Sequence, residues 1–154
     1  MEEKATDLKK RGRIVFLFWA LYAAPAIFSL QYVRPKLIVF RDAVATVNNI
    51  MTHEFLFRMG IASHLIAQVF LLFFGLAVLR LFDGVNKTWA RIFWTSILMT
   101  VAITIVNTLN YVAPLIILSK AEYKNIFQQE QLQALVMLFL RLSNYGQAFF
   151  EIFW

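Results

Sequence analysis

Residues 14–33 read IVFLFWALYAAPAIFSLQYV, a run of twenty residues without a charged side chain. Basic residues flank the run on both sides: Lys9, Lys10, Arg11 and Arg13 before it, and Arg34 and Lys36 after it. An α-helix rises about 1.5 Å per residue, so about twenty residues cross a hydrocarbon core about 30 Å thick. A helix that is apolar on all sides is typical of a membrane span. The run therefore predicts a membrane-spanning helix.

Two further apolar runs, Met59–Leu79 and Ile92–Leu118, are also bounded by basic residues. They predict spans over about residues 56–79 and 92–118. The composition agrees, because 60% of the residues are hydrophobic and 16% are charged, against about 45–50% and about 25% in ordinary soluble domains. The predicted fold class is all-α: a polytopic integral membrane helical bundle that forms a single membrane domain over residues 1–154.

The segment over residues 132–154 predicts a fourth span, with Arg141 and Glu151 as two charges inside it. One face of this helix carries Arg141, Asn144, Gln147 and Glu151. A charge at the centre of a span costs about 2.5–3.5 kcal/mol on insertion scales, so such residues are functional candidates. The structural alternative places Arg141 among the headgroups and pairs Glu151 with a neighbour. In a further alternative, a short surface helix precedes a span that is cut short after Trp154.

Two segments are too polar to span. Residues 1–13 predict a polar tail at the cytoplasmic surface. Residues 37–52 predict an amphipathic surface helix, because apolar residues recur there at steps of three and four. Glu54 and Arg58 follow it, four residues apart and in the favourable order, and predict a surface ion pair.

The distribution of Lys and Arg predicts the orientation of the chain. With the N-terminus inside, the inner side holds eight basic residues: Lys4, Lys9, Lys10, Arg11, Arg13, Arg80, Lys87 and Arg91. The outer side then holds six: Arg34, Lys36, Arg41, Arg58, Lys120 and Lys124. Since cytoplasmic loops carry an excess of Lys and Arg, we expect a cytoplasmic N-terminus.

Polar side chains form a stripe on the third predicted span, made up of Ser96, Thr100, Thr104, Asn107 and Tyr111. At about 100° per residue they lie within about 40° of one line. The second span carries Gly60, His64, Gln68 and Gly75 on one face, where the glycines permit close approach. Polar groups avoid lipid, so we expect Asn107 to face protein, with His64 and Gln68 as its partners. These residues have two alternative roles: they form hydrogen bonds between helices, or they line a cavity for a small molecule.

His64 is a weak candidate for cofactor binding, as a haem or pigment ligand. A structural hydrogen bond and a proton relay are the alternatives. A bis-histidine haem needs a second axial histidine, and His53 lies on the same face about 16 Å away along the helix axis. The zinc motif H-E-x-x-H fails because residue 57 is Phe. The chain has no cysteine and no phosphate-binding or nucleophile motif, so we predict no catalytic residue, no metal site and no cofactor.

The segment NIMTHEFLFRMG over residues 49–60 resembles part of a family of bacterial multi-pass membrane proteins, the domain of unknown function 4386. VNKTWA at 85–90, NYG at 144–146 and IFW at 152–154 are also similar to that family. The resemblance runs from about Arg13 to the end of the chain. It implies an all-helical membrane fold with more helices than this chain contains, and it implies no reaction. We expect the bacterial inner (cytoplasmic) membrane as the location.

The leading functional expectation is a non-catalytic integral membrane protein, a structural or accessory subunit that packs in a membrane complex. The second is a carrier or receptor for a small molecule or lipid, using a polar cavity between the second and third spans. The third is a membrane enzyme or a protein that binds haem or a pigment. The expected partners are membrane lipids and other membrane helices or subunits. Nucleic acid is not expected, because the basic residues bracket apolar spans and form no stripe with interleaved aromatic residues.

Overall fold

A computed structural model describes residues 2–151, with the side chains of residues 6–123 and 125–147. This part of the chain folds into helices and contains no strand. Three continuous helical stretches are long and apolar enough to cross a membrane: Thr6–Leu37, Glu54–Phe82 and Lys87–Ser119. The predicted all-α membrane fold is therefore confirmed.

The first of these stretches begins inside α1 (Glu2–Ile27). It continues through the π-helix η1 (Phe28–Val33) and ends with α2 (Arg34–Leu37). Residues 2–13 of the predicted polar tail form the first turns of α1, and residue 1 lies outside the described residues. Pro25 lies inside α1 and cannot donate a backbone hydrogen bond to the carbonyl four residues back. The wider π-turns follow it, and the Arg34 N–H donates to the carbonyl of Ser29, five residues back. The helix continues past the end of the apolar run at Val33, so Arg34 lies within the candidate span Thr6–Leu37.

The surface helix is α3 (Ala43–Thr52), which begins later than the predicted residue 37. Its start is set by Asp42, whose carboxylate accepts a hydrogen bond of 2.8 Å from the Ala45 N–H. The Thr46 hydroxyl donates to the carbonyl of Val39 and thereby closes the preceding turn. Val47 and Ile50 are buried, so α3 covers one end of the bundle.

Four more helices complete the described chain: α4 (Glu54–Phe82), α5 (Lys87–Ser119), α6 (Ala121–Ile126) and α7 (Gln129–Glu151). The link from α4 to α5 is short, and Asn86 caps α5 by accepting a hydrogen bond of 3.1 Å from the Trp89 N–H. Helix α7 lies where the fourth span was predicted. Within residues 2–151, however, it is not among the helices apolar and long enough to cross a membrane. Residues 152–154 of that predicted span lie outside the described residues.

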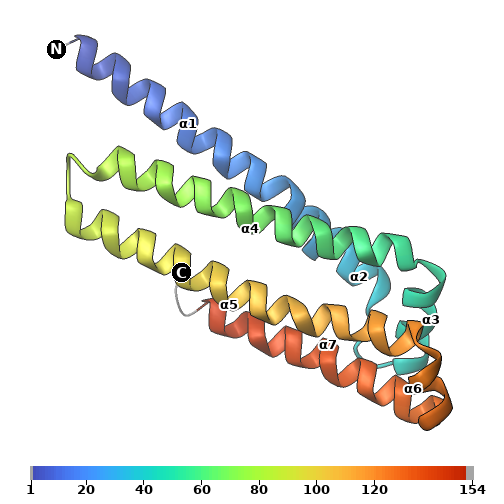
Figure 1. Cartoon of the computed structure of the whole chain (residues 1–154). Helices are drawn as coiled ribbons and strands as arrows, with labels where there is room; N and C mark the ends of the chain where they lie inside the picture. Colours follow the sequence, from blue (N-terminus) through green and yellow to red (C-terminus); the bar gives the residue numbers. More distant parts are fainter. Residues whose placement is uncertain (1, 152–154) are drawn as a thin grey trace.

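The four long helices lie side by side in the order α1, α4, α5, α7, with each antiparallel to the next (Figure 1). Helices α2, α3 and α6 gather at one end of this row (Figure 1). The larger buried cluster lies at that end and is built around Leu37, Ile50, Val136 and Leu140. A smaller cluster farther along joins α4 to α5 through Leu71, Ile97 and Val101. Helices α1 and α7 are thus the two edges of the row.

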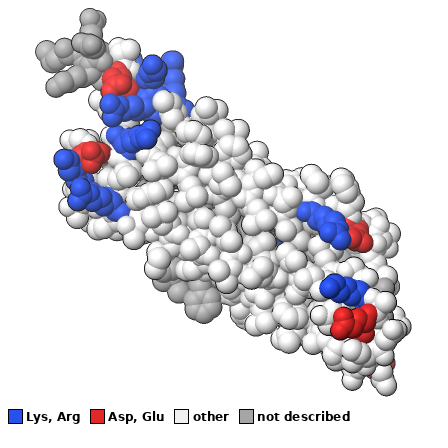
Figure 2. All heavy atoms as spheres, in the orientation of Figure 1, with Lys and Arg blue, Asp and Glu red and all other residues white. Residues whose placement is uncertain are grey.

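Charged side chains gather at the two ends of the molecule, and a broad uncharged band lies between them on the face shown in Figure 2. The band exposes large apolar side chains such as Phe16, Val106 and Leu109. This is the surface expected of a bundle whose middle faces hydrocarbon and whose ends face headgroups and water.

Candidate functional site

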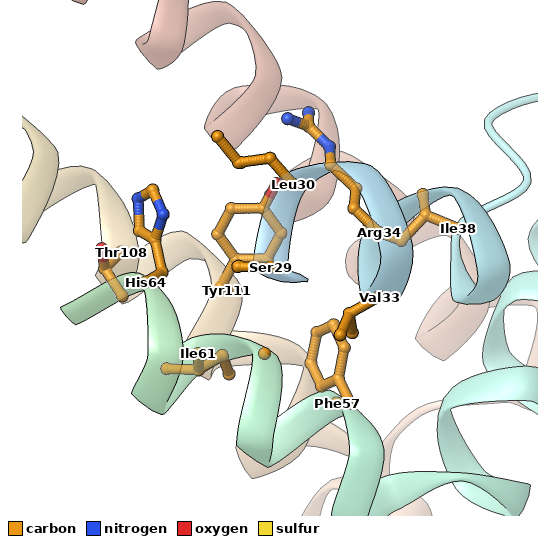
Figure 3. Close-up of a pocket in the computed structure, with 11 residues that line it drawn as sticks. Ser29, Leu30, Val33, Arg34, Ile38, Phe57, Ile61, His64, Thr108 and Tyr111 are labelled. Atoms are coloured by element: carbon orange, nitrogen blue, oxygen red, sulfur yellow. The ribbon is translucent and has the colours of Figure 1, made fainter. Parts of the chain in front are cut away.

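A small cavity lies between η1, α4 and α5 near the end covered by α3 (Figure 3). Its polar lining is Ser29, Arg34, His64, Thr108 and Tyr111, and its apolar lining is Leu30, Val33, Ile38, Phe57, Gly60 and Ile61. We call it the Arg34 cavity. Its volume is about 20 Å³, and a water molecule needs about 10–15 Å³. In this arrangement it has room for little more than a single water.

Glycine brings the walls of the cavity together. A Cβ added at Gly60 would lie 2.7 Å from Cγ1 of Val33, so only a glycine lets η1 pack this closely on α4. At Gly75 an added Cβ would lie 2.9 Å from the Trp94 ring, where α4 meets α5. The two glycines of one α4 face therefore serve different neighbours.

Arg34 is the cation of the site. Its guanidinium points from the cavity toward α7 (Figure 3), where it donates to Gln147 Oε1 and, at 2.6 Å, to Asn144 Oδ1. The guanidinium carbon lies 5.7 Å from the ring centroids of both Tyr111 and Phe40. Within the described side chains, the ion pairs are Asp7–Arg11 and Glu54–Arg58, and neither includes Arg34. Two neutral amides and two aromatic faces thus surround this charge.

The same two hydrogen bonds join the edges of the row. Helix α1 packs against α4, and α7 packs against α5, so the first and last helices have separate neighbours. Arg34 reaches across from the start of α2, directly after η1, to Asn144 and Gln147 on α7. We call this contact the Arg34 link.

His64 lines the cavity from α4 and is only 8% exposed (Figure 3). Its Nδ1 has no hydrogen-bond partner among the described residues. Oε1 of Gln68 on α4 and Oγ1 of Thr100 on α5 are among the other buried polar atoms that share this condition. A buried polar group left unpaired costs about 1–3 kcal/mol. Of these residues His64 lines the Arg34 cavity, where a solute or a bound water can supply the missing hydrogen bond.

The structure divides the predicted polar stripe of α5. Thr100 and Thr104 are buried, and Tyr111 lines the Arg34 cavity. Ser96 instead donates to the Ile92 carbonyl of its own helix at 3.1 Å. The stripe is thus not one continuous site.

Asn107 faces protein, as expected, but the prediction that His64 and Gln68 are its partners is wrong. Its Nδ2 donates to the Ser143 carbonyl of α7 at 2.9 Å, and its Oδ1 accepts from Asn110 at 3.0 Å. The physical reason is Gly146 on α7, since a Cβ there would occupy the space that the Asn107 amide fills. The asparagine therefore packs on α7 and leaves the α4 side to the threonines.

The remaining polar candidates lie away from the cavity. Glu54 and Arg58 form an exposed ion pair of 2.6 Å at the start of α4. Arg141 is exposed and donates to the Phe40 carbonyl at 3.3 Å. Glu151 follows Gln147 by four residues in α7, and its side chain lies outside the described residues.

Sequence reasoning missed Arg34, Ser29 and Thr108 as parts of the site. The sequence alone indicates that Arg34 is a charge flanking the span, because the apolar run ends one residue before it. A π-turn holds one residue more than an α-turn and so rotates the following side chains by about 100°. The usable signals were Pro25 upstream of a basic residue and the polar face of α7 that carries Asn144 and Gln147.

The donors at the site are not a metal set. No group of three or more His, Asp or Glu side chains close enough to hold a metal occurs among the described residues. The cavity instead offers a guanidinium, an imidazole and hydroxyl groups beside apolar walls. Such donors suit an acidic group better than a cation.

No curated protein and no solved structure matches this chain. The family model described as a domain of unknown function, DUF4386, matches residues 15–154. That range includes η1, the His53–Gly60 block at the start of α4, and α7. The chain therefore belongs to the DUF4386 family.

Proposed function

We propose that this protein binds a small anionic solute, one with a carboxylate or phosphate group, in the Arg34 cavity and acts as a membrane-embedded carrier or receptor. The observation that carries the proposal is the guanidinium of Arg34, which lies in a candidate span and, among the described side chains, bonds to two amides and to no carboxylate. A charge within a span is expensive and therefore marks a substrate or ion site more often than a structural one. Arginine is the side chain best shaped for a bidentate contact with carboxylate or phosphate.

The solute has to displace the Arg34 link. The bonds from Arg34 to Asn144 and Gln147 already have an ionised donor. An anion competes with these amides because it adds the attraction of an opposite charge and can accept two guanidinium N–H groups at once. Releasing them separates η1 from α7 and enlarges a cavity that otherwise holds about one water. The Ser29 hydroxyl then becomes a further donor, whereas the Thr108 hydroxyl already donates to the Thr104 carbonyl at 2.8 Å.

The flexible element for this motion is η1. The π-turns and Pro25 weaken the regular backbone ladder of the first span, and such interruptions are where membrane helices bend. The protein then opens between its two edge helices while α4 and α5 stay packed.

The test is thermal unfolding of the purified protein in detergent with acetate, phosphate or sulfate, each compared with chloride at equal ionic strength. A ligand at one hundred times its dissociation constant stabilises the native state by about 2.7 kcal/mol. We expect at least one anion to raise the unfolding temperature of the wild type and of Arg58→Gln, and to leave Arg34→Gln unchanged. Arg58→Gln is the matched control because it removes the same charge from an exposed surface pair. Equal shifts in both variants, or no shift in the wild type, would contradict the proposal.

A structural or accessory subunit is the second candidate. It is favoured by α1, an edge helix whose described side chains Phe16, Trp19 and Ile27 are exposed and available to other membrane helices. Under this proposal, purification in mild detergent retains another membrane protein in stoichiometric amount. Retention of a partner without any anion-induced stabilisation would favour the accessory function over the carrier.

We also propose that the protein resides in a bacterial cytoplasmic membrane with its N-terminus inside. The start of α1 and the α4–α5 loop lie at the same end of the row (Figure 1), and eight of the fourteen basic residues counted for the orientation belong to that end. The chain has no cysteine, so single cysteines are clean probes. An impermeant maleimide on intact cells should label Lys120→Cys and should label Val85→Cys only after permeabilisation. The reverse pattern would overturn the orientation.

A further inference from the structure

A second hollow lies far from the Arg34 cavity, where α1 and α4 diverge toward the N-terminal end of the row (Figure 1). It is lined by Arg11, Ile14 and Phe18 of α1 and by Phe73, Leu76, Ala77 and Arg80 of α4. Its volume is about 240 Å³. We call it the Arg11–Arg80 groove.

The mouth of the groove is basic. Arg11 Nη1 donates to the backbone carbonyl of Arg80 at 3.2 Å, which brings the Arg11 side chain to the end of α4, and both arginines line the groove. Asp7 pairs with Nε of Arg11 at 2.8 Å, whereas the exposed Arg80 side chain takes part in neither ion pair of the described side chains. The two arginines that line the groove, with one paired carboxylate, leave its lining with one positive charge. Figure 2 shows lysine and arginine gathered at this end of the molecule.

Below the mouth the groove is apolar. Ile14 and Phe18 follow Arg11 by three and seven residues, so the hollow extends about 10 Å along α1 toward the middle of the span. The stacked rings of Phe18 and Phe73, with centroids 5.5 Å apart, close its deep end. A basic mouth therefore leads directly into an apolar channel within the uncharged band.

We infer that the Arg11–Arg80 groove binds one anionic phospholipid. The phosphate contacts Arg11 and Arg80 at headgroup depth, and an acyl chain lies against Ile14, Leu76 and Ala77. Lipid is the occupant that the geometry favours, because a soluble anion leaves the apolar channel empty. The anionic class follows from the charge at the mouth, since basic residues near a membrane surface attract acidic lipid at about 1 kcal/mol each. The site is independent of the Arg34 cavity, which lies at the other end of the first span.

The experiment is native mass spectrometry of the full chain after incubation in detergent with phosphatidylglycerol or phosphatidylcholine of identical acyl chains. We expect one phosphatidylglycerol to remain bound per chain, with phosphatidylcholine retained at least tenfold less. The double variant Arg11→Gln/Arg80→Gln should lose this preference. The control, Lys87→Gln/Arg91→Gln, removes the same charge from exposed residues at the same end and should keep it.

A second variant tests the apolar part without altering charge. Ala77→Phe fills the channel, so it should reduce retention of phosphatidylglycerol at least tenfold while the protein keeps its helical content by circular dichroism. Inorganic phosphate at equal concentration should not compete, because it lacks the acyl chain. The inference is overturned if both lipids are retained equally, if the control loses the preference as fully as Arg11→Gln/Arg80→Gln does, or if inorganic phosphate displaces the lipid.

Discussion

Single side chains decide how closely the helices of this bundle approach each other. At residue 60 the absence of a Cβ allows Val33 to pack on α4, and at residue 146 it makes room for the Asn107 amide. Membrane helices associate mainly through such close packing and through interhelical hydrogen bonds, since lipid supplies no hydrophobic drive between them. Small changes at these two contacts should therefore have measurable effects.

Gly60→Ala should destabilise the protein by about 1–3 kcal/mol, the usual cost of overpacking a well-filled contact. The added methyl group would lie 2.7 Å from Val33 Cγ1, so η1 or the valine has to move. Gly12→Ala is the control, because nothing lies within 4 Å of a Cβ at that position. It should be neutral or stabilising by up to about 1 kcal/mol, as expected for alanine replacing glycine in a helix. Chemical unfolding in mixed micelles measures both variants, and equal effects would contradict the packing at Gly60.

Asn107→Leu should cost about 0.6–1.7 kcal/mol, the range measured for interhelical polar contacts in membranes. The change removes the hydrogen bond to the Ser143 carbonyl and places a bulkier apolar group against Gly146. Ser96→Ala serves as the comparison, because the Ser96 hydroxyl bonds within its own helix, and it should change stability by much less. A higher unfolding temperature for Asn107→Leu than for the wild type would rule out the α5–α7 contact.

At the scale of an element, α3 shows how a surface helix is fixed over the end of a bundle. Its inner side chains Val47 and Ile50 join the larger buried cluster, while Asp42 sets the residue at which it begins. Asp42→Ala should cost about 0.5–2 kcal/mol, as other N-cap replacements do. Amide hydrogen exchange should speed up at Ala45 and through the first turn of α3. Asp83→Ala, at the C-terminal cap of α4, should leave α3 exchange unchanged, and equal acceleration in both variants would contradict the capping role.

The spans were predictable from the sequence because each is an apolar run of membrane-crossing length between basic residues. The end of the first helix was not, since it continues through Arg34, whose side chain donates to Asn144 and Gln147 more than a hundred residues later. The start of α3 was predictable from Asp42, a typical N-cap residue, but the prediction used only the spacing of the apolar residues. The partner of Asn107 depends on which neighbouring helix brings a glycine opposite it, and no local pattern reports that. His64 and Tyr111 were recognised as polar candidates, but their meeting with Arg34 is a property of the π-turns of η1.

At the scale of the whole molecule, the helices form a row that is joined across its edges by Arg34. Helices α4 and α5 are packed in its middle, whereas α1 and α7 each have one long neighbour. A solute that replaces Asn144 and Gln147 at Arg34 thus frees the two edges from each other without breaking the central α4–α5 contact. The central claim is that this link is exchanged for an anion.

Spin labels at two exposed positions, Gln31 on η1 and Tyr145 on α7, test that claim most directly through their distance distribution. The cysteine-free chain allows both labels to be placed specifically, and a pair at Ile66 on α4 and Leu109 on α5 is the control. We predict that acetate or phosphate lengthens the Gln31–Tyr145 distance, that Arg34→Gln shows the longer distance without any anion, and that the control pair stays constant. The claim would be contradicted by a Gln31–Tyr145 distance that is the same in three samples: the wild type without anion, the wild type with either anion, and Arg34→Gln.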